Sequence, residues 1–234
     1  MALQTVTNLA DRAQVYLNDV AVGTWPQATV ETWVVDAVRD YSQYFPRVIY
    51  DALADVGSSP DHYVELSDEF LEMIQVEFPT GSTPPNYLQR RSMHHPNFWE
   101  VDGYYDIVYT EQDATDPGGA IRALLMFSRQ PVDDEGWAIR YLARHPADGA
   151  GDDVTVPEDH HQILMLFVVW QAVKERAATA IQDPDTTSDS LQKMVNAEMQ
   201  AHEEYRRAIN NAQQKRAQSG WSGPWTADAY DPIY

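Results

Sequence analysis

The sequence contains no cysteine, which excludes disulfide bonds and thiolate metal sites. Lysine is also rare, with only Lys174, Lys193 and Lys215 among 234 residues. Long hydrophobic runs are missing as well. The longest, Ile163 to Trp170, has eight residues, whereas a membrane-spanning helix needs about 20. The first ten residues lack the basic start and apolar run of a signal peptide. We therefore expect a soluble protein with no membrane partner.

Positive charge is scarce overall, because 36 acidic residues face 16 basic ones and the formal net charge is -20. Such a chain repels nucleic acid unless its few arginines cluster. Arg90-Arg91 and Arg206-Arg207 are the only adjacent arginine pairs, and the net charge argues against a DNA site at either. The excess acid either keeps the protein soluble or lines a channel through which DNA slides without sticking.

Helical periodicity dominates the first part of the chain. Hydrophobic residues make up 44% of the sequence, so a packed core is expected. Residues 5–17 read as one helix and residues 29–45 as a second. Thr29 is a plausible N-cap of the second helix, and Pro46 ends it. We expect the two helices to pack as an antiparallel pair.

The middle of the chain changes to strand patterns. Residues 48–50 fit either an extension of the helical region or a strand, and residues 70–78 are equally ambiguous. Residues 63–66 look extended. The clearest strands are 104–109, 121–127 and 137–142, with Trp137, Ile139 and Tyr141 on one side of the last. A small antiparallel sheet is therefore predicted.

The last third is helical again. One helix is predicted over 157–182, with Pro157 at its first position and a middle, Ile163 to Trp170, that is apolar on every side. Asp183-Pro184 breaks it, and a second helix is predicted over 188–218. Glu198 interrupts the stripe of that helix, which consists of Leu191, Met194, Val195, Met199, His202, Tyr205, Ile209 and Ala212.

The final segment, 219–234, contains glycines and prolines that disfavour regular helix. It is nevertheless rich in large side chains, which are typical of binding segments and unlike a disordered tail. The segment either binds a partner or folds back onto its own domain. Its candidate partner-binding residues are Trp221, Trp225, Tyr230, Ile233 and Tyr234.

No reactive constellation is recognisable, and we predict no catalytic residue, metal or cofactor. His94-His95 and His160-His161 are adjacent pairs, which make poor chelates on a helix. His160 and His202 would approach if the last two helices pack, with Glu198 one turn before His202. In the absence of an HExxH pattern, the simpler interpretation of Glu198 and His202 is a hydrogen-bonded pair at a helix contact or a subunit interface.

Loop motifs also fail to indicate chemistry. Gly118-Gly119 has no following helix that would offer its N-terminus to a phosphate. The acidic runs 133–135 and 152–153 lie in turn-rich loops, where solvation explains them, although a weak divalent-cation site there stays open.

Four local features give the chain a family resemblance. They are Leu9-Ala10-Asp11-Arg12 with the helix containing Trp33 to Asp40, then Tyr63 to Phe70, then Tyr141 to Pro146, and finally Val156 to His161 opening a helix through Trp170-Gln171-Ala172. In this order they span roughly residues 5–215. The chain resembles the head-to-tail adaptor (connector) proteins of tailed phages, the ring that docks beneath the portal.

The resemblance implies an α+β fold, mainly α: a helical bundle with an inserted small antiparallel β region and an extended C-terminal arm. We expect one adaptor domain over 1–218, with the β-rich insertion at about 62–145, and the arm over 219–234. The resemblance further implies a structural protein of the virion neck and not an enzyme. Its partners would be the portal, tail or neck proteins, and identical subunits in a ring of twelve, with DNA passing through the lumen without specific binding. Alternatives are a tail-completion or tail-terminator protein, a small helical enzyme, or an acidic binding module.

Overall fold

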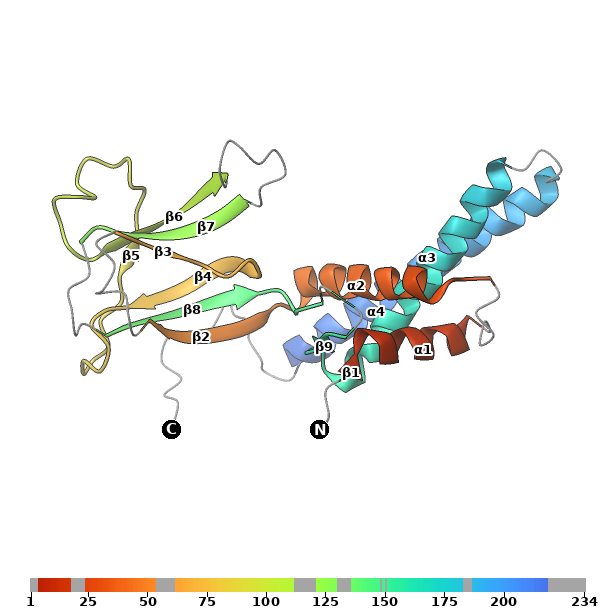
Figure 1. Cartoon of the computed structure of the whole chain (residues 1–234), viewed down its shortest axis with the longest axis horizontal. Coiled ribbons are helices and arrows are strands. Elements are labelled where there is room, and N and C mark those ends of the chain that lie inside the picture. Colours follow the sequence, from red (N-terminus) through yellow and green to blue (C-terminus); the bar gives the residue numbers. More distant parts are fainter. Residues whose placement is uncertain are drawn as a thin grey trace. The chain divides into compact units, whose positions relative to one another are not determined.

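The computed structural model describes residues 4–17, 24–53, 62–111, 121–129, 136–147, 149, 151–182 and 187–218. The chain divides into two compact units (Figure 1). A helical unit is formed by Met1–Pro46 together with His145–Tyr234, and a sheet unit is formed by Arg47–Arg144. The predicted α+β class is confirmed, since the described residues form four α-helices and antiparallel sheets.

The helical unit has two pairs of helices, separated in sequence by the sheet unit. The helices are α1 (Val6–Tyr16), α2 (Gln27–Tyr44), α3 (His161–Gln182) and α4 (Ser188–Gln218). A two-stranded antiparallel ladder joins β1 (Gln4–Thr5), just before α1, to β9 (Asp153–Val154). This ladder was not predicted, because two residues are too few to show strand periodicity.

Two helix starts differ from the prediction. Thr29 does not cap α2, because the carbonyl of Pro26 already accepts the amides of Thr29 and Val30, and the helix begins at Gln27. Pro157 does not begin α3. A short 3-10 helix, η2 (Glu158–His160), follows Pro157, and α3 begins only at His161. The acidic residues of η2 still precede the positive end of a helix, as the dipole favours.

The core of the helical unit is centred on α3, which packs against α1, α2 and α4. The prediction of a buried middle is confirmed for Ile163–Met165, Phe167 and Val168, while Leu166 and Trp170 are half-buried. From α1 and α2 the same core receives Leu9, Ala13, Val30, Val34, Val38 and Tyr41. The 3.6-residue repeat of the two N-terminal helices therefore does mark their buried faces.

The sheet unit contains two sheets where one was predicted. Its strands are β2 (Arg47–Leu53), β3 (Tyr63–Glu65), β4 (Phe70–Glu77), β5 (Gln89–Arg90), β6 (Tyr104–Glu111), β7 (Ile121–Phe127) and β8 (Trp137–Ala143). One sheet has the order β2-β8-β4, and the other has the order β3-β7-β6-β5. Both ambiguous segments are thus strands, β2 and β4. The short β5 pairs parallel to β6, while the other pairs are antiparallel.

Strand β8 was predicted to bury Trp137, Ile139 and Tyr141 on one side. All three are buried, but so are Ala138 and Leu142 on the other side. The reason is that β8 is the middle strand of its sheet and is covered on both faces, which removes the alternation. Phe127 of β7 and Trp137 of β8 join the two sheets, with ring centroids 4.3 Å apart, and Phe78, which follows β4, stacks on Trp137 at 3.7 Å between centroids.

Candidate functional site

The histidines of the helical unit are held by partners within that unit. The Nδ1 atom of His160 and the phenol oxygen of Tyr41 form a hydrogen bond at 2.5 Å, and burial lowers the pKa of His160 although Asp159 raises it. Burial also raises the pKa of Tyr41, so the phenol keeps its proton. The contact ties η2 to α2 and leaves His160 as a structural side chain.

The predicted approach of His160 to His202 with Glu198 is corrected by these contacts. His202 stacks on Trp170, with ring centroids 4.5 Å apart, and Glu198 accepts the indole N–H of Trp170 at 3.0 Å. The two side chains therefore lie at the α3–α4 contact, as the simpler interpretation held, but they bind Trp170 and do not form a pair. Helical spacing placed them on one face, while only packing could reveal Trp170 as their shared partner.

Two further histidines bridge segments far apart in sequence. His161 donates from Nε2 to the carbonyl of Val156 at 3.0 Å, and its Nδ1 lies 3.4 Å from the guanidinium of Arg12. His145 donates from Nε2 to the carbonyl of Phe45 at 3.0 Å, and its Nδ1 contacts the hydroxyl of Thr155 at 2.8 Å. Both rings are buried, so these bonds satisfy polar atoms that would otherwise be costly.

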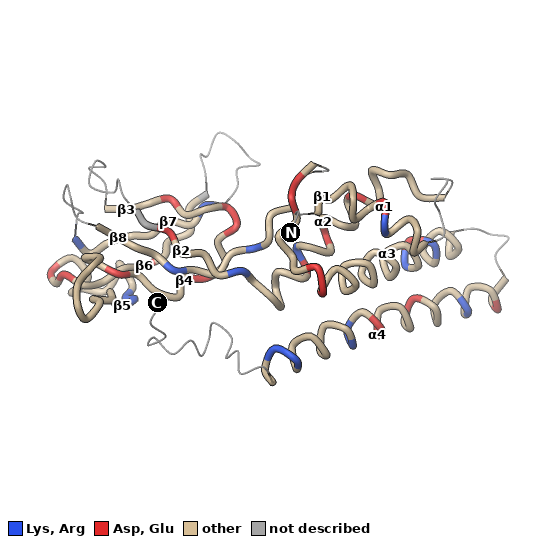
Figure 2. Tube along the Cα trace, turned by 90° about the horizontal axis from the view of Figure 1, so that it is seen from below, with Lys and Arg blue, Asp and Glu red and all other residues tan. Residues whose placement is uncertain are grey.

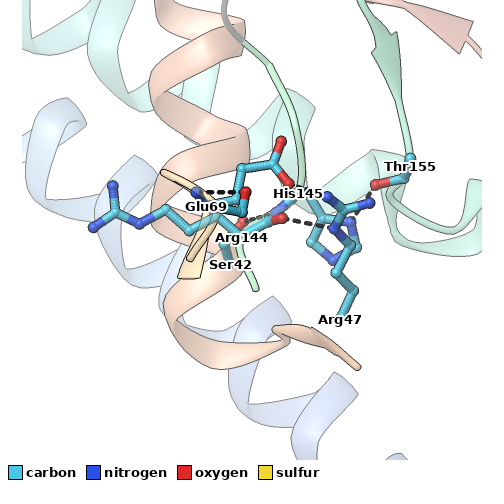
Figure 3. A network of polar contacts seen from close by, with 7 residues as sticks. Ser42, Arg47, Glu69, Arg144, His145 and Thr155 are labelled. Carbon is cyan, nitrogen blue, oxygen red and sulfur yellow. Dashed lines mark hydrogen bonds and ion pairs between the residues drawn. The ribbon is translucent and has the colours of Figure 1, made fainter. Parts of the chain in front are cut away.

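Polar bonds fasten the chain where it leaves and re-enters each unit (Figure 3). In the sheet unit, Arg47 donates to the carbonyl of Arg144 at 2.8 Å and forms an ion pair with Glu69. In the helical unit, the amide of His145 donates to the hydroxyl of Ser42 at 3.0 Å. Each unit therefore closes its own pair of chain ends, which allows the sheet unit to be one continuous insertion of the sequence.

Metal-binding chemistry is not apparent among the residues that the structure describes, where no three histidine, aspartate or glutamate side chains converge. Asp152 caps a turn by accepting the amide of Gly149 at 2.6 Å, and Asp153 belongs to β9. The acidic run 133–135 and the pair Gly118-Gly119 lie outside the described residues. No described helix is both long enough and apolar enough to cross a membrane.

The side chains of the two arginine pairs have different surroundings. Arg90 lies 3.8 Å from the carboxylate of Asp106, and Arg91 covers the ring of Tyr104 at 4.2 Å. Arg206 and Arg207 are exposed on α4, in a stretch that contains no acid. From Tyr205 to Gln218 the basic residues are Arg206, Arg207, Lys215 and Arg216, so this end of α4 is a local exception in an acidic chain (Figure 2).

The apolar stripe predicted along α4 is buried over only part of its length. Tyr205, Ile209 and Ala212 are buried, and Tyr205 donates a hydrogen bond to Asp40 of α2. Burial, and then this bond, raise the pKa of Tyr205. None of the described residues between Ser188 and Glu204 is buried, and Met199 is 56% exposed.

A groove runs along this uncovered part of the helical unit. It has a volume of about 350 Å³ and lies between α3 and the first half of α4. Its lining is mainly apolar, with two cations at the edge, and consists of Val173, Arg176, Ser190, Lys193, Met194 and Ala197. The sequence signalled it only indirectly, because Met194 was assigned to a stripe that was expected to be covered.

A second pocket, of about 250 Å³, lies wholly within the sheet unit. The rings of Phe78, Phe127 and Trp137 form one wall, and Asp102 and Arg129 also line it. Arg129 covers the ring of Phe78 at 4.8 Å, so the aromatic faces are already occupied by the chain's own side chains. The five residues predicted to bind a partner, Trp221, Trp225, Tyr230, Ile233 and Tyr234, lie outside the described residues.

Comparison with known proteins gives one family. The model of the family described as SU10 adaptor protein matches residues 4–228, which include both units and the first part of the predicted arm. No curated protein matches the chain significantly. The family match covers nearly the whole sequence, in agreement with the motif order that suggested an adaptor. The chain therefore belongs to the SU10 adaptor protein family, a family of phage head-to-tail structural proteins and not of enzymes.

Proposed function

We propose that this protein forms a ring that docks beneath the portal and connects the capsid to the tail while leaving a channel for DNA. The observation that carries the proposal is the SU10 adaptor match over residues 4–228. Membership of this family implies a place in the virion neck and contacts with portal and tail proteins. In addition to these implications, we propose the ring, its docking beneath the portal and its DNA channel.

A closed ring requires that one face of each subunit fit a different face of its neighbour. The helical unit supports such an arrangement because its helices present different side chains on different faces. Twelve copies would match a twelvefold portal. The sheet unit then adds a separate surface for a tail or neck protein.

The proposed portal contact is the C-terminal arm, residues 219–234. Trp221, Trp225, Tyr230, Ile233 and Tyr234 would supply the large apolar anchors that dominate binding energy at interfaces. Such an arm enlarges the portal contact without requiring a larger folded domain.

The channel is proposed to be lined by acidic side chains, because carboxylates repel the phosphates of passing DNA. Four bases cluster at the end of α4 between Tyr205 and Gln218. They would bind phosphate if they faced the lumen, so we propose that this end of α4 faces away from the DNA. A charge map of the assembled ring with a basic lumen would contradict the channel.

The central test is the mass of the purified protein, alone and mixed with portal rings of the same phage. The expected result is a complex that contains one portal and one adaptor ring. Monomer in isolation agrees with the proposal if the portal triggers assembly. A protein that stays monomeric in the presence of portal rings contradicts it.

A truncated chain ending at Gln218 tests the arm. We expect it to keep the helical signal of the full chain in circular dichroism and to lose portal binding. The matched control is Tyr109→Ser, which removes a 60% exposed aromatic side chain from β6 and should leave portal binding unchanged. Undiminished binding of the truncated chain would contradict the arm.

A further inference from the structure

The groove between α3 and α4 leaves apolar surface uncovered in the single chain. Val173, Met194 and Ala197 line it, and two more large side chains, Ile181 at 63% and Met199 at 56% exposure, belong to the same two helices. A contiguous exposed apolar surface is typical of an interaction site. Lys193 forms an ion pair with Asp189 of its own helix, so Arg176 is the lining cation that favours an occupant with apolar and negative groups.

A second uncovered patch lies at the end of α1. Val15 is 62% exposed and its neighbour Tyr16 is 59% exposed. One turn before Val15, the exposed Asp11 adds a carboxylate that also accepts a hydrogen bond from Gln27. Its neighbour Arg12 lies 3.4 Å from Nδ1 of His161, so the guanidinium is directed toward the start of α3. The last turn of α1 also contains no basic residue, so the negative end of the helix dipole is uncompensated there. This end of α1 thus has the apolar and negative character that the groove would accept.

The two patches belong to different helices, the groove to α3 and α4 and the second patch to α1. α3 packs against both α1 and α4, and Figure 2 shows α4 along one side of α3 with α1 on the other. A patch on one side and its complement on the other are what a head-to-tail contact between identical subunits needs. A contact of the groove with itself would instead bring the Arg176 side chains of two copies together, which is unfavourable.

We propose that the end of α1, with Val15 and Tyr16, inserts into the α3–α4 groove of a second copy of this chain. The contact is heterologous, so it repeats from copy to copy and is able to close a ring. This contact would be the one between neighbouring subunits of the proposed ring. Closure of the ring rests on the proposed function, whereas the contact between two copies does not. Asp11 of one copy would lie near Arg176 of the next.

The absence of cysteine allows a direct test, because the chain has no native thiol that could compete with the introduced ones. The variant Val15→Cys with Ala197→Cys places one thiol at each side of the proposed contact. Both positions are exposed, so folding should be unaffected. The variant is mildly oxidised under two conditions. In the first it is alone at high concentration, and in the second it is bound to portal rings. The controls are the two single variants.

The expected result is a ladder of covalent dimers, trimers and larger species for the double variant, with monomers for each single variant. The absence of a ladder in both conditions overturns the contact. Dimers of Ala197→Cys alone also overturn it, because they show groove facing groove. Portal binding of the wild type is measured separately, so a bound ring without a ladder rejects this contact but not the proposed function.

A bifunctional thiol reagent with a photoreactive end, attached to Ala197→Cys, identifies the occupant by the mass of the product. A product of two copies that contains the end of α1 supports the contact, and one that contains a portal subunit overturns it. Reversal of charge provides an independent check. Arg176→Glu should reduce the ladder, and adding Asp11→Arg should restore it. Loss without restoration would contradict the proposed proximity of the two charges.

Discussion

The two halves of α4 belong to one continuous helix but have different surroundings. The half after Glu204 is anchored by Tyr205 and Ile209, which are 4% and 3% exposed. The half before it packs through half-buried side chains and carries Met199 in the open. Both halves have similar apolar spacing in the sequence. The difference shows that the apolar stripe of a single helix can be buried in the subunit core at one end and exposed at the other.

The largest expected effect is a difference in the free energy of unfolding between a substitution in each half of α4. Ile209→Ala should lower the free energy of unfolding by about 2–4 kcal/mol, because it removes a buried side chain and leaves a cavity. Met199→Ala should change it by less than about 0.5 kcal/mol, since that side chain is mainly exposed. Urea unfolding followed by circular dichroism measures both. Equal losses would show that the two halves are packed alike.

The next effect concerns the bond between α4 and α2. Tyr205→Phe keeps the ring but leaves the carboxylate of Asp40 without this donor, and should cost about 1–2 kcal/mol. The control is Tyr16→Phe, whose hydroxyl is on an exposed side chain and should contribute nothing measurable in the monomer. An unchanged midpoint of urea unfolding for Tyr205→Phe would show that this bond does not stabilise the second half of α4.

A smaller effect is expected at the boundary between the halves. Glu198→Ala deprives the indole N–H of Trp170 of its acceptor and should cost about 0.5–1.5 kcal/mol. Glu198→Gln retains an acceptor oxygen and should cost less than the alanine variant. If both variants match the wild type in thermal unfolding, the first half of α4 is held by apolar contact alone.

The smallest expected effect is a change in the pH dependence of stability at His160 of η2. The pKa of His160 is lowered by burial, with Arg216 and Lys215 of α4 lowering it further. Below about pH 6.5 the unfolded chain therefore takes up a proton that the folded chain resists, and stability falls as the pH decreases. His160→Gln should flatten this fall between pH 7 and pH 5, relative to the wild type.

The control for this measurement is His94→Gln, because His94 is an exposed side chain of the sheet unit. Its slope of unfolding free energy against pH should follow the wild type. A wild-type slope in His160→Gln as well would mean that other groups cause the acid sensitivity.

Much of the helical unit could be predicted from sequence. Val30, Val34 and Val38 recur at helical spacing and are buried as that spacing implies. The sheet unit was harder, since β2 and β4 carry mixed patterns and β8 loses its alternation by being covered on both faces. Trp170 was recognised only as part of an apolar run, and its bonds to Glu198 and His202 depend on how α3 and α4 pack.

By itself, the sequence determined the helices, the main strands and the adaptor family, because each depends on local periodicity or on the order of motifs along the chain. Only the tertiary structure decided which part of the α4 stripe is buried. Spacing defines a face of a helix, but it does not say what lies opposite that face. Here Tyr205 contacts Asp40 of α2 and Phe167 of α3, and Ile209 belongs to the same core, whereas a groove remains open beside Met194.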